Sequence, residues 1–292
     1  QQVSSAASDV YKRQLIAQYT GADENSRLTR QNITKIEFDT TMHLLAPYLK
    51  SGADVCELGA ATGRYSLSFA KMGCTVTSVE LVPDQVEILK KNAERKDLTI
   101  DIHLGSACHV PFIESGSQDI CVILGPLYHL KTKSERDQAI SEAKRILKPN
   151  GILAVAYISR FFVAGLFAQK FPHLVTPSIL SELYTNGTVT ASEADRFFRV
   201  GYFASPEEIE HLLRSHTFNI LDHAATDGFG RYISEGINSF TPSQYQTWLE
   251  YHLNTCRQSS LLGSSNHGLV IAKKQSKQLK KIQNVWHERC RL

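Results

Sequence analysis

The sequence lacks any long hydrophobic run. Its longest uninterrupted apolar stretch, residues 152–158, is far shorter than the roughly 20 residues that a helix needs to cross a bilayer. No segment near the start combines positive charge, an apolar core and small residues in the manner of a secretory signal. We therefore expect no membrane span and a cytoplasmic location.

Strong net charge, paired cysteines and metal-ligand spacings are also missing. A formal charge of +3 over 292 residues is too small to indicate a nucleic-acid or membrane surface by itself. The six cysteines form no C-x-x-C pair, which favours reduced structural thiols. No spacing of His, Cys and carboxylates predicts a metal site, and neither a P-loop nor G-x-S-x-G occurs. We expect a small-molecule partner and no metal; the oligomeric state is not indicated.

The first fourteen residues form a separate case. Residues 9–14 are the translation of GAT-GTG-TAT-AAG-AGA-CAG, the end of a transposon used to prepare sequencing libraries. We expect residues 1–14 to be translated adapter, and the alternative is a natural, disordered, Ser/Ala-rich N-terminus.

What the sequence does contain is a helical start followed by alternating strands and helices. Residues 15–50 predict a helical N-terminal cap. Residues 51–273 predict one α/β domain, because short apolar runs alternate there with amphipathic helices. The expected strands are 53–58, 75–81, 100–104, 119–124, 151–158, 218–225 and 268–273.

Residues 159–215 interrupt this alternation. The segment is too long for a connection and contains helical patches of its own, so we expect an insertion that covers the active site as a lid. Residues 274–292 are basic and polar and predict a frayed or solvated helical tail.

The strongest local signal is the run Glu57-Leu58-Gly59-Ala60-Ala61-Thr62-Gly63, in which a strand enters a turn of small residues and then a helix. Gly59 and Gly63 leave no side chain where a ligand must lie against the backbone. The G-x-x-x-G spacing differs from the G-x-G-x-x-G of dinucleotide sites. Glu57 would be unfavourable beside a pyrophosphate and suits a ligand with an amino group and a cationic sulfonium.

A second acid, Glu80, ends the next strand, 23 positions after Glu57. A carboxylate at this place can accept hydrogen bonds from both hydroxyls of a ribose. A surface charge at a strand end would explain Glu80 alone, but the upstream glycine turn favours the binding role.

Residues 53–158 resemble the class I S-adenosylmethionine-dependent methyltransferases, in the broad group that includes the ubiquinone and menaquinone methyltransferases. The resemblance is carried by the glycine turn, by Glu80, by Leu104-Gly105-Ser106-Ala107, and by Arg145-Ile146-Leu147-Lys148-Pro149-Asn150-Gly151. It implies a Rossmann-like, doubly wound, seven-stranded and mostly parallel sheet that binds S-adenosyl-L-methionine. A further resemblance to bacterial members of unassigned substrate covers residues 15–273.

The resemblance also implies roles by position. Glu57 would orient the amino group of the cofactor, and Glu80 would hold its ribose. The other implied cofactor-binding residues are Gly59, Ala60, Ala61 and Gly63 at the methionine moiety, Leu81, Ser106 and Ala107 at the ribose and adenine, and Leu124 and Gly125 with main-chain carbonyls near the amino group.

Two positions depart from the family pattern. The family commonly has glycine at the position of Ala61, and aspartate, which caps the adenine amino group, at the position of Ser106. Ser106 can still accept one bond, so the resemblance implies reduced affinity for the cofactor.

Direct transfer of a sulfonium methyl requires that the acceptor is aligned with the methyl group and that water is excluded. It requires a general base only where the acceptor must lose a proton. The candidates are Tyr128 and His129 after the fourth strand, because substrate meets the methyl group there in this fold. His223, Asp227 and His267 are weaker candidates, and a structural role is the alternative for each histidine.

Three other functions remain open. An RNA- or protein-modifying methyltransferase would use the basic tail as an electrostatic contact. A nucleotide-dependent oxidoreductase is disfavoured by the glycine spacing. A non-catalytic cofactor-binding member is compatible with Ala61 and Ser106, since a fold alone does not decide function.

Overall fold

The computed structural model describes residues 12–22 and 24–275 of the chain. Residues 1–11 of the expected adapter segment and residues 276–292 of the expected basic tail lie outside the described residues. Residues 12–19 are helical, so the last part of the suspected adapter continues into the folded chain.

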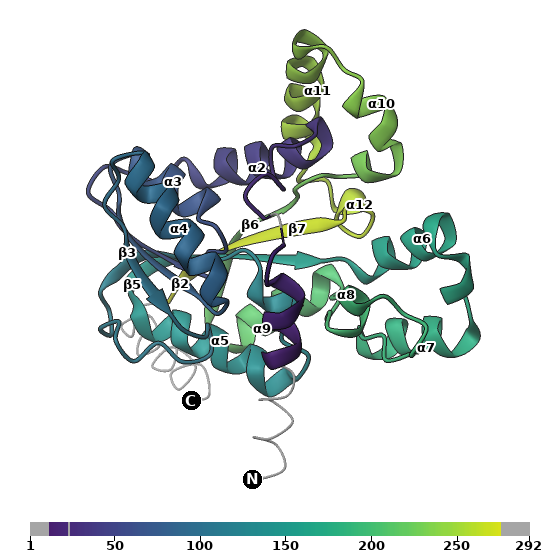
Figure 1. Cartoon of the computed structure of the whole chain (residues 1–292), viewed down its shortest axis with the longest axis horizontal. Helices are drawn as coiled ribbons and strands as arrows, with labels where there is room; N and C mark the ends of the chain where they lie inside the picture. The colour runs from purple at the N-terminus through teal and green to yellow at the C-terminus, as the bar shows by residue number, and fades with distance from the viewer. Residues whose placement is uncertain (1–11, 23, 276–292) are drawn as a thin grey trace, which may run out of the picture.

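A seven-stranded sheet forms the centre of the described chain, in the order β3-β2-β1-β4-β5-β7-β6 (Figure 1). Strands β1 to β5 are parallel, and β7 runs antiparallel to both β5 and β6. The predicted Rossmann-like, mostly parallel sheet is therefore confirmed. The strands are β1 (Asp54–Leu58), β2 (Thr75–Glu80), β3 (Asp101–Leu104), β4 (Gln118–Ile123), β5 (Leu147–Ile158), β6 (Phe218–Ala225) and β7 (His267–Lys274).

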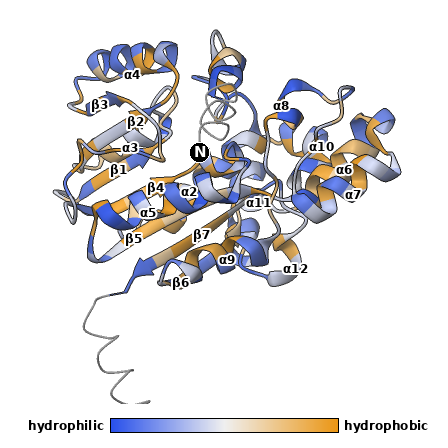
Figure 2. Cartoon of the chain, turned by 90° about the horizontal axis from the view of Figure 1, so that it is seen from below, coloured by the Kyte–Doolittle hydropathy of each residue, from blue (hydrophilic) through white to orange (hydrophobic). Residues whose placement is uncertain are grey.

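Alternating side chains of the strands pack against helices on both faces. Helices α5 (Lys133–Ile146) and α9 (Pro206–Ser215) share an apolar cluster with Cys56 and Leu58. Helices α2 (Asn32–Leu45) and α3 (Arg64–Lys71) share another with Val55. Helix α4 (Pro83–Arg95) packs beside α3 through Leu89. Strands that are buried on both faces consist mainly of apolar residues. Accordingly, the central strands β4, β5 and β7 are mostly hydrophobic in Figure 2.

The N-terminal cap differs from the expectation of one helical region over residues 15–50. Turns separate the helix of residues 12–19 from α2, which begins only after Gln31 and ends at Leu45. Gln31 and Thr34 exchange capping bonds at the start of α2, and this local pairing competes with a longer helix.

Strand β5 also begins earlier than expected. The sequence predicts this strand from residue 151 onward, but β5 starts at Leu147, which pairs with Gln118 of β4. Asn150 adopts a positive φ of 64° within β5, a conformation that asparagine tolerates.

Two helical extensions leave the sheet at its antiparallel end (Figure 1). The first contains α6 (Arg160–Lys170), η2 (Pro172–Leu174), α7 (Pro177–Asn186) and α8 (Arg196–Arg199) around its own apolar cluster. Helix α9, which was expected inside the insertion, instead covers the sheet beside β6. The second extension contains η3 (Gly230–Ile233), α10 (Ser234–Asn238), α11 (Pro242–Thr255) and α12 (Ser259–Leu262), and α10 and α11 pack on α2.

None of the helices described here combines the length and the apolar composition that crossing a membrane requires.

Gly63 is held between α3 and α4, and this packing generates a stability prediction. Its φ is +86°, and an added Cβ would lie 1.9 Å from Leu89 Cδ1. We expect Gly63→Ala to lower the free energy of unfolding in urea by about 2–4 kcal/mol, from backbone strain and overpacking together. Gly52 has a similar φ of +82° with no atom within 4 Å of the added Cβ. Gly52→Ala should therefore lose only about 1 kcal/mol, and equal losses in the two variants would contradict the packing argument.

Candidate functional site

One cavity of about 910 Å³ lies at the carboxyl ends of the parallel strands, the edge at which open α/β sheets bind ligands. Its walls come from the turn after β1, the ends of β2 and β4, residues 15–22 and 24–34, α6, α8, η3 and the start of β7. The sequence-predicted cofactor residues that line it are Glu57, Gly59, Ala60, Ala61, Glu80, Leu81, Ser106, Ala107, Leu124 and Gly125. Gly63 does not line the cavity, and its part in ligand binding stays a prediction.

The glycine turn is fixed to the neighbouring strand by backbone hydrogen bonds. The amides of Gly59 and Ala60 both donate to the Val79 carbonyl, at 2.7 and 3.1 Å. Gly59 has a φ of +82°, and a Cβ there would lie 2.4 Å from Pro126 Cγ. Ala61 adopts a φ of 46°, a conformation that glycine adopts at lower cost. The turn thus exposes backbone to the cavity without intervening side chains at Gly59.

Glu80 is oriented by two backbone amides. The Ala61 amide donates to Oε2 and the Val82 amide to Oε1, each at 2.8 Å. Burial raises the pKa of this carboxyl, although these bonds oppose the shift. A carboxylate has about four lone-pair positions, so Glu80 can still accept a hydrogen bond from a ligand.

Glu57 also lines the cavity, and it ends a chain of hydroxyl groups. Ser66 Oγ donates to Glu57 Oε2, and Ser78 Oγ donates to Ser66 Oγ at 2.7 Å. Burial raises the pKa of Glu57 to about 8. The side chain is therefore mainly protonated at neutral pH until a cationic group approaches it.

Two buried amide oxygens in the cavity wall have no hydrogen-bond partner in the described part of the chain. They belong to Gln18 and Gln85. The Gln85 amide nitrogen donates to the carbonyl of Tyr19 at 3.0 Å, which fixes the side chain. Because buried acceptors are normally satisfied, these oxygens mark places for N–H or O–H donors of a ligand.

Tyr128 and His129, the predicted catalytic candidates, both line the cavity, but their polar atoms bind protein. Tyr128 donates to the Leu124 carbonyl at 3.2 Å. His129 Nε2 lies 2.8 Å from the Tyr19 hydroxyl, and the ring also bonds the backbone of Val200. Burial lowers the pKa of His129 to about 4. These contacts favour a positioning role, and catalysis by either residue stays a prediction.

The weaker candidates separate into two places. His223 does not line the cavity, and its ring lies between the Tyr157 hydroxyl at 2.9 Å and Glu210 Oε1 at 2.8 Å. His267 does line the cavity, and Asp227 lies buried directly behind it.

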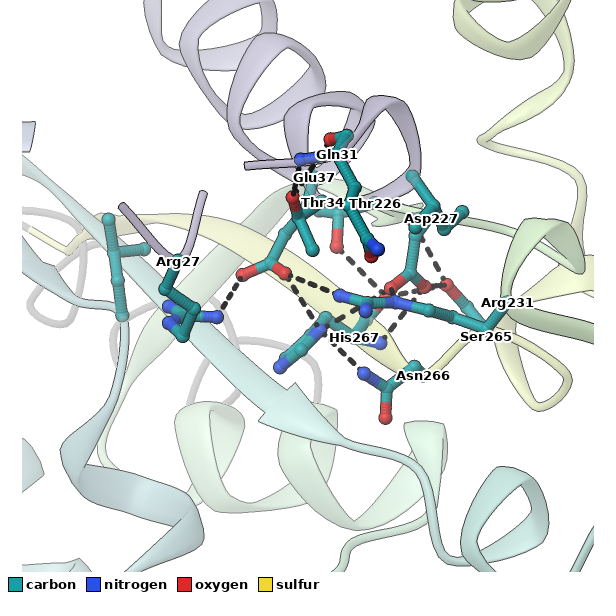
Figure 3. Close-up of polar contacts among 12 residues, drawn as sticks. Arg27, Gln31, Thr34, Glu37, Thr226, Asp227, Arg231, Ser265, Asn266 and His267 are labelled. Carbon is teal, nitrogen blue, oxygen red and sulfur yellow. Dashed lines mark hydrogen bonds and ion pairs between the residues drawn. The ribbon is translucent and has the colours of Figure 1, made fainter. Parts of the chain in front are cut away.

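Behind His267 lies a buried ion-pair network (Figure 3). Arg231 binds Asp227 Oδ2 at 2.9 Å through Nε and Glu37 Oε2 at 3.1 Å through Nη2. Burial by itself would raise the pKa of Asp227, but His267, Arg231 and Ser265 outweigh it and hold that pKa well below its usual range. Sequence reasoning missed Glu37 and Arg231, because α2 and η3 meet only in the folded chain.

Glu37, Asp227 and His267 also meet the distance requirement for a metal site, with possible ligand atoms within 4.8 Å of one another. Arg231 already binds both carboxylates with its guanidinium. A metal ion on the same oxygens would be repelled by that charge, so the geometry favours an ion-pair network.

The comparisons with known proteins agree on the type of domain. Residues 56–155 match the family model described as a methyltransferase domain. The ubiquinone biosynthesis O-methyltransferase of Xanthomonas oryzae is 26% identical over 172 residues, which cover 59% of this chain and 65% of that protein.

Solved structures share the fold at low identity. A SAM-dependent methyltransferase from Methanosarcina mazei has a TM-score of 0.56 at 16% identity, over 80% of this chain and 98% of the other. The Burkholderia thailandensis 1,6-didemethyltoxoflavin-N1-methyltransferase, solved with bound 1,6-didemethyltoxoflavin and S-adenosylhomocysteine, has a TM-score of 0.55 at 15% identity, over 93% of this chain and 90% of the other. The [4+2]-cyclase SpnF has a TM-score of 0.50 at 19% identity, over 82% and 80%.

The buried acid Glu57 predicts a pH dependence of stability. Its folded pKa of about 8 lies above the ordinary value of 4.5, so between these values the unfolded chain loses a proton that the folded chain keeps. The free energy of unfolding should therefore fall as pH rises through this window, by at most about 1.4 kcal/mol per pH unit. Glu57→Gln removes this contribution, and urea denaturation of both proteins at pH 5, 6, 7 and 8 measures it. A difference between them that stays constant over this range would refute the raised pKa.

Proposed function

We propose that this chain, of which residues 56–155 match a methyltransferase domain and whose fold is shared with a SAM-dependent methyltransferase, transfers the sulfonium methyl directly to a nucleophilic atom of a small-molecule acceptor. The observation that carries the proposal is the convergence of Glu57, the glycine turn and Glu80 on one cavity.

In this proposal the cavity residues hold S-adenosyl-L-methionine from three sides. Gly59, Ala60 and Ala61 lie along the methionine moiety, and Glu57 and the carbonyls of Leu124 and Gly125 face its amino group. Glu80 accepts the ribose hydroxyls, with Leu81 beside it, and Ser106 and Ala107 border the adenine.

The polar groups of the cavity fit such a ligand. Glu80 offers a lone pair on oxygens that backbone amides already fix. The unpartnered oxygens of Gln18 and Gln85 can accept hydrogen bonds from a ligand rich in N–H and O–H groups. Glu57, protonated when alone, becomes a carboxylate beside an ammonium group because the opposite charge favours ionisation.

The bound cofactor supplies an activated methyl group, so the chain itself needs to align the acceptor and exclude water. Apolar side chains of α6 and α8 also line the cavity, among them Phe162, Leu166 and Phe197. They support an acceptor with an apolar body. A total of about 910 Å³ lies near the upper end of ordinary ligand cavities, which leaves space for two small molecules.

One alternative retains cofactor binding without methyl transfer. It is supported by the shared fold of the [4+2]-cyclase SpnF and by Ala61 and Ser106, which depart from the family pattern. In that case S-adenosylhomocysteine would still bind, but no small molecule would be methylated.

The first test is calorimetric titration of S-adenosylhomocysteine, with NAD as the competing ligand class. We expect binding of S-adenosylhomocysteine in the micromolar range, about −8 kcal/mol, and none of NAD. Gly125→Ala should weaken binding at least tenfold, because its Cβ would stand 3.5 Å from the Tyr128 hydroxyl and 4.0 Å from Gly59 O, in the crevice itself.

Gly236→Ala is the matched control, because no atom lies within 4 Å of its added Cβ and the residue does not line the cavity. Absence of S-adenosylhomocysteine binding in folded protein would overturn the proposal, and preference for NAD would replace it with an oxidoreductase.

A variant with higher affinity for S-adenosylhomocysteine tests whether Ser106 borders the adenine. Ser106→Asp introduces the acceptor that the family commonly has for the adenine amino group, and one added hydrogen bond contributes about 0.5–1.5 kcal/mol. Roughly 2–10-fold tighter binding of S-adenosylhomocysteine is expected. The gain should vanish with S-inosylhomocysteine, which lacks that amino group, and an equal gain with both ligands would place the adenine elsewhere.

A further inference from the structure

His267 presents its two ring nitrogens to different surroundings. Nδ1 lies 3.2 Å from Glu37 Oε2 and 3.4 Å from Asp227 Oδ2. In Figure 3 the other side of the ring points away from these two carboxylates. Nε2 has no hydrogen-bond partner among the described residues and is not among their buried unpartnered atoms, while the residue lines the cavity. Nε2 is therefore open to a ligand.

The carboxylates determine which nitrogen carries the proton. Ionised carboxylates accept hydrogen bonds and cannot donate them, so they favour a proton on Nδ1. The amide nitrogen Nδ2 of Asn266 lies 3.0 Å from Nδ1, and turning this amide over places its oxygen there as a third acceptor of the Nδ1 proton. The lone pair of the neutral imidazole is then on Nε2, toward the cavity.

Charged groups of both signs surround His267. Glu24 and Glu37 pair with Arg27, while Glu37 and Asp227 pair with Arg231. The Tyr128 ring also faces the imidazole, at 6.0 Å between ring centroids. The two arginines thus hold Glu37 and Asp227 in place beside Nδ1.

The position of His267 connects both parts of the cavity. The Tyr128 ring stands between His267 and the crevice of the glycine turn, because Tyr128 also contacts the backbone at Leu124 and the site of Gly125. The apolar residues Phe162 and Leu166 of α6 line the same cavity and share an apolar cluster with Tyr128. An acceptor with its body against α6 brings its polar end to this region.

We propose that His267, oriented by Glu37 and Asp227, is the general base of this site and that the acceptor is a hydroxyl compound with an apolar body, such as a substituted phenol. This inference rests on the proposed function. Phenols and alcohols are weak nucleophiles until their proton is removed, and this arrangement supplies a base where the acceptor has to lie.

The step is balanced without any additional reactant. His267 Nε2 takes the hydroxyl proton, the acceptor oxygen forms a bond to the methyl carbon, and the electron pair of the broken C–S bond stays on sulfur. A methyl ether, S-adenosylhomocysteine and an imidazolium result, and the imidazolium returns its proton to water.

The test uses 4-nitrophenol as the probe, because its phenolate absorbs visible light and its ionisation can be measured without turnover. The full chain is first saturated with S-adenosylhomocysteine, and the probe is titrated with pH. We expect bound probe to ionise with an equilibrium constant at least tenfold larger than free probe. His267→Gln should bind the probe and lose this gain, and Glu37→Gln should reduce it.

His223→Gln is the matched control. His223 is likewise buried beside a carboxylate, Glu210 at 2.8 Å, but does not line the cavity. The gain should be unchanged in this variant. Equal ionisation of the probe in the wild type and in His267→Gln would overturn the role of His267 as general base. Failure of the probe to bind the saturated protein would overturn the proposed class of acceptor. Failure of S-adenosylhomocysteine to bind at all would instead overturn the proposed function.

Nitrogen-15 NMR of the histidine rings provides a readout without any acceptor. Neutral His267 should carry its proton on Nδ1, and Glu37→Gln should shift that preference toward Nε2. A neutral ring protonated on Nε2 in the wild type would contradict the proposal, since it leaves no lone pair toward the cavity.

Discussion

The carboxylate of Glu80 holds two backbone amides from separate parts of the chain, and the cavity depends on that pair of bonds. One amide belongs to Ala61 in the turn after β1, and the other to Val82 at the start of α4. With the bonds of Gly59 and Ala60 to Val79, they join the turn to the end of β2. A non-glycine residue, Ala61, is thereby kept at a φ of 46°, a strain of about 1 kcal/mol or more. The same oxygens keep a lone pair for a ligand, so one side chain both shapes the crevice and faces it.

A second constraint lies across the cavity, where several charges are buried together. Removing one partner of a buried pair leaves a charge without compensation, which is far costlier than the net gain of an intact pair. Arg231 satisfies this requirement by contacting both Glu37 and Asp227. Because Glu37 is on α2 and Asp227 follows β6, the network joins the N-terminal cap to the antiparallel end of the sheet. The side of the cavity that contains His267 therefore depends on contacts between α2 and the residues that follow β6.

The positions of the strands along the chain, the glycine turn and Glu80 were predictable because their signals are local. The glycine turn, Glu80 and the apolar runs each stand within a few residues of the element they specify. Glu37 and Arg231 gave no such signal: the first occupied an ordinary polar position of an amphipathic helix, and their meeting requires a fold that brings α2 to η3. His129 drew attention by following β4, yet its partner Tyr19 lies 110 positions earlier. Helix α9 was expected in the insertion because sequence pattern cannot tell which apolar face a helix packs against.

The first helical extension folds around its own cluster of apolar side chains, and the family match ends at residue 155, before α6 begins. The matched segment therefore includes the cavity residues of the glycine turn, β2 and β4, and it excludes α6 and α8. Under the proposed function, the residues that face the acceptor come from a part of the chain with its own apolar cluster. The extension is then the part to exchange when a new acceptor specificity is engineered.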